Sequence, residues 1–144
     1  GRYEEPELTL IDIRPVASGN LEQRFALRFR LLNPNSVSLP VKGVRYRVEL
    51  LGETFASGAT SQDLTIEAFT DAEFDVTVGV SLLRAARVLM KAMSLQGEPL
   101  TYRLDARIAT TIPVLGDVRV VRDGEVSLEG IAAAPASVSG AGPG

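Results

Sequence analysis

The sequence predicts an all-β domain with a single helix, arranged as an antiparallel β-sandwich. Apolar and polar side chains alternate along most of the 144 residues, and this period of two is typical of strands that bury one face. Gly, Pro, Asn and Asp interrupt the alternation at short intervals, as turn residues do. Only residues 81–95 change to helical spacing. About seven to nine short strands, each with one apolar face, are buried most economically by two sheets packed face to face.

Residues 8–13 form the first predicted strand, and Pro15 should end it because proline cannot donate to a sheet ladder. The apolar phase slips between Leu10 and Ile11, which indicates a β-bulge. The second strand, about 22–32, places phenylalanines and leucines on one face and arginines on the other. Those arginines are Arg24, Arg28 and Arg30.

The tripeptide Asn33-Pro34-Asn35 ends the second strand. Pro34 has no N–H for a ladder and keeps Asn33 extended, and Asn35 tolerates the left-handed conformation that turns often require. We interpret the tripeptide as turn chemistry that fixes where the strand stops. A recognition loop is the alternative.

The middle of the chain contains five further strand segments. They are residues 37–41, 44–50, 54–56, 64–66 and 74–80. Pro40 gives the first of these an edge position, and Ser57-Gly58 should close the third.

Residues 81–95 predict the helix, with Ser81 as its N-cap and Gly97 where a terminator belongs. Six apolar side chains recur at helical spacing: Leu82, Leu83, Ala86, Leu89, Met90 and Met93. We expect this stripe to close one end of the sandwich. A membrane-surface element is the alternative, because three basic residues flank the stripe. They are Arg84, Arg87 and Lys91.

After the helix, residues 100–109 alternate again and residues 113–116 form a loop. The tripeptide Arg122-Asp123-Gly124 is a strong hairpin-turn signal. We expect three parts in the chain: a flexible lead-in, a β-sandwich domain and a disordered small-residue tail. They span residues 1–6, 7–130 and 131–144.

Composition excludes several kinds of site. Without Cys or His, the chain offers no disulfide, no zinc–thiolate centre, no histidine base and no Ser-His-Asp triad. We predict no catalytic residue, no cofactor and no metal site. The net charge of −3 argues against a nucleic-acid partner, and no apolar run is long enough for a transmembrane segment.

Carboxylates leave two alternatives open. Asp71, Glu73 and Asp75 alternate along one strand and could offer oxygen ligands to calcium, although no glycine-centred loop surrounds them. We predict a solvated strand face there. A carboxylate pair could also hydrolyse a glycosidic bond, but the sequence predicts no cleft for a sugar.

Four stretches of the chain carry a family resemblance. They are residues 29–41 with Asn33-Pro34-Asn35 at their centre, residues 44–58, residues 97–104, and Ile112-Pro113-Val114-Leu115-Gly116. In this order and spacing the chain resembles the late-embryogenesis-abundant type 2 family, also called the water-stress and hypersensitive-response domain. The resemblance implies an immunoglobulin- or fibronectin-III-like sandwich and a non-enzymatic role in water stress. Asn33, Pro34 and Asn35 are the family's signature turn.

The same resemblance implies partners and a location. Protection would come from weak, non-specific shielding of client proteins or membrane surfaces by a monomer. Bacterial members of the family are often exported as lipoproteins, so a periplasmic or outer-membrane-anchored location is expected, with the cytoplasm as the alternative.

An arginine-bearing sheet face is the second functional hypothesis. In an immunoglobulin-like order, the strand with Arg45 and Arg47 neighbours the strand with Arg103 and Arg107, and guanidinium groups bind phosphate or carboxylate. The domain would then be an envelope binding module for an anionic lipid, polysaccharide or protein. A ladder of cross-strand ion pairs is the simpler interpretation, because acidic residues are interleaved.

Overall fold

The computed structural model describes residues 4–19, 21–112 and 115–126. These residues form seven strands and one helix. In chain order they are β1 (Glu7–Ser18), β2 (Glu22–Leu32), β3 (Leu39–Leu50), β4 (Glu53–Ile66), β5 (Asp71–Ser81), α1 (Leu82–Met93), β6 (Leu100–Thr110) and β7 (Asp117–Val126).

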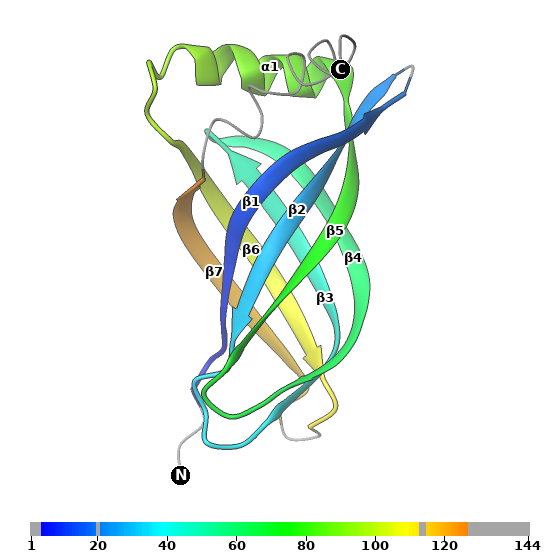
Figure 1. Ribbon diagram of the computed structural model, residues 1–144, viewed down its shortest axis with the longest axis vertical. Helices are drawn as coiled ribbons and strands as arrows, with labels where there is room; N and C mark the ends of the chain where they lie inside the picture. Colours follow the sequence, from blue (N-terminus) through cyan, green and yellow to red (C-terminus); the bar gives the residue numbers. More distant parts are fainter. Residues whose placement is uncertain (1–3, 20, 113–114, 127–144) are drawn as a thin grey trace, which may run out of the picture.

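The strands form two antiparallel sheets that pack as a sandwich (Figure 1). One sheet has the order β1-β2-β5 and the other β4-β3-β6-β7. The helix α1 follows β5 and lies across one end of the two sheets, where it covers the core. The predicted all-β class with one helix is therefore confirmed.

Side chains from both sheets meet in the core. Phe29 of β2 lies between Phe74 of its own sheet and Tyr46 of the opposite sheet, with ring centroids 5.6 and 5.7 Å away. Phe25 contacts Phe55 across the same gap at 5.2 Å. These tilted ring contacts add to the burial of apolar surface that drives the two sheets together.

The first strand differs from its predicted end. The bulge expected beside Leu10 is confirmed, because the pairing of β1 with β2 shifts between Leu10 and Asp12. The stop expected at Pro15 is wrong, since β1 continues to Ser18 with a second shift after Pro15. β1 lies at a sheet edge. An edge strand tolerates proline because one of its sides has no neighbouring strand that needs an N–H donor.

Two glycines that predicted turns lie inside strands instead. β4 runs without a break through Gly58, and β7 runs through Gly124, so both predicted turns are wrong. Gly58 pairs with Tyr46 and Gly124 with Tyr102. A Cβ at Gly124 would lie 2.7 Å from the Tyr102 ring, and one at Gly58 would lie 3.0 Å from the Tyr46 hydroxyl. These glycines therefore make room for aromatic rings on the neighbouring strand.

The helix has the predicted cap but a different buried face. The Ser81 hydroxyl accepts a hydrogen bond from the backbone N–H of Arg84 at 3.1 Å, and Gly97 takes a positive φ of 90° beyond the helix end. Val88 and Ala92 are fully buried. Most of the predicted stripe instead faces outward, which corrects the expected orientation.

Part of the predicted N-terminal lead-in belongs to the folded domain. Glu4 exchanges two hydrogen bonds with Asn35, of 2.7 and 2.8 Å, and Pro6 is buried. This portion of the predicted lead-in thus packs against the domain. The tail predicted for residues 131–144 lies outside the described residues.

Candidate functional site

The predicted arginine face lies on the outer surface of the four-stranded sheet. β3 and β6 are paired neighbours, as expected, and Arg45 stands directly opposite Arg107. Arg47 is opposite Asp105, while Arg103 is opposite Glu49. We call the four arginines Arg45, Arg47, Arg103 and Arg107 the arginine face.

A fifth arginine, Arg119 of β7, extends this surface. Arg119 is opposite Arg107, so three guanidinium-bearing residues cross three strands in one row. Arg119 was not among the predicted site residues, although its alternation with the buried Val118 and Val120 indicates an outward face. The alternation does not predict that β7 pairs with β6, and this pairing brings Arg119 next to Arg107.

The acidic residues of this surface do not contact its arginines equally. Arg119 takes both carboxylate oxygens of Asp105, at 3.1 and 2.8 Å. This bidentate pair lowers the pKa of the Asp105 carboxyl and raises that of the Arg119 guanidinium. Asp105 therefore makes its hydrogen bonds to Arg119, while the charges of Arg107 and Arg103 act on the same carboxylate and also lower its pKa.

The four arginines of the face differ in their side-chain contacts. Arg47 donates to Thr54 Oγ1 at 3.0 Å and lies 3.9 Å from Glu49, and Arg103 lies 3.7 Å from Asp123. Among the described residues, neither Arg45 nor Arg107 has an ion pair or a side-chain hydrogen bond.

A shallow depression of about 490 Å³ lies beside these two side chains. Arg45, Arg47 and Arg107 line it. Its other side comes from β4, which places the small residues Ser57 and Ala59 opposite Arg47 and Arg45. Small side chains between exposed guanidinium groups leave room for a phosphate or a carboxylate, which arginine binds through paired N–H donors.

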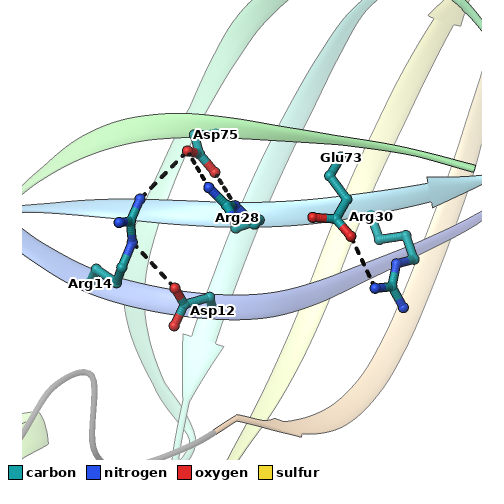
Figure 2. A network of polar contacts seen from close by, with 6 residues as sticks. All are labelled: Asp12, Arg14, Arg28, Arg30, Glu73 and Asp75. Atoms are coloured by element: carbon teal, nitrogen blue, oxygen red, sulfur yellow. Dashed lines mark hydrogen bonds and ion pairs between the residues drawn. The ribbon is translucent and has the colours of Figure 1, made fainter.

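The opposite sheet shows the contrasting arrangement (Figure 2). Arg28 holds Asp75 through two hydrogen bonds of 2.9 and 3.2 Å, and Arg30 holds Glu73 at 3.0 Å. Arg14 lies within ion-pair distance of Asp75, at 3.6 Å. Here each of these arginines has a carboxylate, so the β1-β2-β5 sheet carries a ladder of ion pairs. On the four-stranded sheet, for which the ladder was considered, ion pairs involve Arg47, Arg103 and Arg119.

The three carboxylates that were considered as calcium ligands contact arginines instead. Asp75 and Glu73 accept from arginines, and Asp71 lies 3.8 Å from Arg30. In the part of the chain that the structure describes, no three His, Cys, Asp or Glu side chains gather as a metal group. In the same part, no helix is long and apolar enough to cross a membrane.

The signature turn is buried rather than presented to solvent. Asn33 is fully buried, and its side-chain amide donates to the carbonyls of Val37, Ile66 and Glu67 at 2.8, 3.0 and 3.3 Å. Its Oδ1 accepts from the backbone N–H of Asn35 at 3.0 Å. These bonds tie the end of β2 to the link between β4 and β5.

The left-handed residue in this region is Phe69, with φ of 59°, and not Asn35. The backbone N–H of Phe69 donates to the Asn35 carbonyl at 3.1 Å. The tripeptide therefore orders two adjacent loops, and its buried amides are not available to a partner.

Comparisons with known proteins agree with this geometry. A family model described as late embryogenesis abundant protein matches residues 28–123. A solution structure from Arabidopsis thaliana aligns with a TM-score of 0.66 at 17% identity, over 88% of this chain and 84% of that one. A second, of a putative late embryogenesis abundant protein from Arabidopsis, has a TM-score of 0.52 and 25% identity over 86% and 71%. No curated protein matches by sequence.

Proposed function

The chain belongs to the late embryogenesis abundant protein family, and we propose that it is a folded, non-enzymatic domain that protects client proteins or membranes during water loss. The observation that carries this proposal is the family match, which extends from within β2 into β7. Family membership supports a water-stress-related domain, and the protective role is proposed on that basis.

The surface of the domain supports shielding by a folded protein. Arginines and carboxylates alternate on the outer faces of both sheets and pair across strands. The mixed charges of such a surface keep it hydrated and soluble. A domain of this kind can separate client molecules as they become concentrated.

Drying a client enzyme in the presence of the chain tests the proposal. We expect more client activity to be recovered than with an equal mass of serum albumin. Recovery equal to that with albumin would show that the chain contributes only bulk protein, and the protective role would then be wrong.

The arginine face supports a second function, that of a binding module for an anionic partner. The specific observation is the opposed pair Arg45 and Arg107, which makes no ion pair or side-chain hydrogen bond among the described residues and lines the 490 Å³ depression together with Asp105. In this proposal the domain resides in the cell envelope, and its ligand presents phosphate or carboxylate groups.

Retention on a phosphate-bearing resin tests the second function. Replacing Arg45 and Arg107 by Gln should lower the salt concentration at which the chain elutes, because phosphate contacts are screened by salt. The matched control replaces Arg28 and Arg30 by Gln, which removes the same charge from the opposite sheet. Equal shifts for both double variants would mean that only net charge matters and would exclude a site.

A further inference from the structure

The helix α1 presents a second apolar face that is exposed in the part of the chain that the structure describes. Its inner side packs on the core through Val88 and Ala92. Ala85 and Leu89 are partly buried against the same core. The other apolar side chains of the helix face outward: Leu82, Leu83, Ala86, Met90 and Met93. We call these five residues the outward stripe.

The outward stripe is strongly exposed. Leu83 and Met90 each keep 72% of their surface exposed, and Met93 keeps 70%. A surface helix normally carries polar residues on this side, and gathered apolar side chains at a surface mark a contact site. Leu21, which is 82% exposed, lies next to the start of the helix, where its carbonyl accepts from the Leu82 N–H at 3.1 Å.

The charge on α1 is entirely basic. Arg84, Arg87 and Lys91 lie on the helix, which contains no Asp or Glu. Arg87 and Lys91 lie 3.8 and 3.7 Å from Glu53 of β4, while Arg84 has no ion pair with a described residue. This concentration of positive charge contrasts with the chain's net charge of −3.

The outward stripe and the basic charge of α1 together indicate what kind of partner binds the helix. Pairing of two copies through the outward stripe would bring the basic residues of both helices together, and like charges in contact are unfavourable. A lipid surface with anionic headgroups instead offers apolar chains for the stripe and phosphates for the basic residues. The flexible methionines suit such an irregular apolar surface.

We propose that α1 docks on anionic lipid bilayers, with the outward stripe at the acyl-chain boundary and Arg84, Arg87 and Lys91 at the phosphates. The position of α1 across one end of the sandwich lets it lie flat on a surface without contact from the sheet faces (Figure 1). This inference does not depend on a protective role, so the drying assay and a vesicle assay can fail separately.

A single tryptophan can report the docking, because the chain has none of its own. In Leu83→Trp, we expect fluorescence to move to shorter wavelength with vesicles of phosphatidylcholine plus phosphatidylglycerol, and much less with phosphatidylcholine alone. Phe69→Trp is the matched control: Phe69 is 68% exposed and precedes β5, at the end of the sandwich away from α1. It should show no shift.

Vesicle flotation supplies a second measurement on chains without tryptophan. Replacing Leu83 and Met90 by Ser should reduce partitioning at least about tenfold, since both apolar side chains are lost to the membrane. Arg84→Gln should reduce it about fivefold, the equivalent of about 1 kcal/mol per basic residue near an anionic surface. Val37→Ser, which removes an exposed apolar side chain elsewhere, should leave it unchanged.

Three outcomes would overturn the proposal. One is equal partitioning of wild type and the Leu83/Met90 double variant. Another is an equal shift for Trp at position 69. The third is a shift of Leu83→Trp that rises with protein concentration in the absence of vesicles, which would assign the outward stripe to self-association.

Discussion

The side-chain amide of Asn33 binds three backbone carbonyls from two separate loops. Asn33→Ala would remove these bonds and would leave the buried Asn35 N–H without its acceptor. The Glu67 carbonyl would keep its bonds from Thr70. We expect the free energy of unfolding to fall by about 3 kcal/mol, since each buried unsatisfied group costs about 1–3 kcal/mol. Urea denaturation measures the change. Ser36→Ala, in the same loop but exposed, should change stability by less than about 0.5 kcal/mol.

The glycines of β4 and β7 give a second prediction for single residues. Gly124→Ala should destabilise the protein by about 1–3 kcal/mol, because the new methyl overlaps the buried Tyr102 ring. Gly58→Ala should cost less, since its nearest contact, the Tyr46 hydroxyl, is 3.0 Å away. Gly19→Ala is the control, with its nearest neighbour at 3.8 Å. Thermal melts that rank Gly19→Ala as the most damaging would refute this account.

The roles of these glycines could not be predicted from the local sequence. Locally, Ser57-Gly58 and Arg122-Asp123-Gly124 have the composition of turns. Their actual role depends on the aromatic residue across the ladder, at Tyr46 or Tyr102. That neighbour follows from register, which no local pattern contains.

Among the elements, α1 shows what amphipathic spacing can and cannot predict. The helix and its Ser81 cap were predictable from local chemistry. The buried face was not, because apolar side chains cover more than half of the helix circumference and two overlapping subsets could pack inward. The subset containing Val88 and Ala92 does so, since its small and β-branched side chains let the helix approach the ends of the sheets.

The orientation of α1 has a direct consequence for stability. Val88→Ala should lower the free energy of unfolding by about 1–3 kcal/mol, because a fully buried side chain loses its packing. Met90→Ala, on the outward stripe, should change it by less than about 0.5 kcal/mol. Chemical denaturation of both variants makes the comparison. The reverse order would mean that α1 packs through its other face.

The β1-β2-β5 sheet predicts a pH dependence. Hydrogen bonds from Arg28, then the charges of Arg28 and Arg14, hold the pKa of the Asp75 carboxyl below its ordinary 3.8. A carboxyl with a depressed folded pKa contributes stability that is present above the unfolded value and is lost as pH falls through the folded value. Its contribution should therefore disappear below pH 3.8.

Asp75→Asn tests that dependence. Its stability difference between neutral pH and a pH below 3.8 should be smaller than that of wild type, as urea midpoints at the two pH values will show. Asp63→Asn, at an exposed position outside the network, should keep the wild-type difference. An unchanged difference in Asp75→Asn would remove Asp75 from the acid response.

For the whole molecule, strand alternation was sufficient for the fold class, and the family resemblance supplied the neighbouring positions of β3 and β6. The charge distribution on the arginine face was only partly predictable. Alternation placed Arg45, Arg107 and Asp105 outward, but the capture of Asp105 by Arg119 depends on how β7 pairs with β6. That single pairing decides which arginines remain available to a ligand.

The proposed function is tested most directly by asking whether protection during water loss requires the folded sandwich. Client-enzyme activity after drying should be measured with wild type, Asn33→Ala and Ser36→Ala, at a temperature where only Asn33→Ala is unfolded. We predict that wild type and Ser36→Ala preserve the client better than serum albumin and that Asn33→Ala does not. Equal preservation by the unfolded variant would contradict the account.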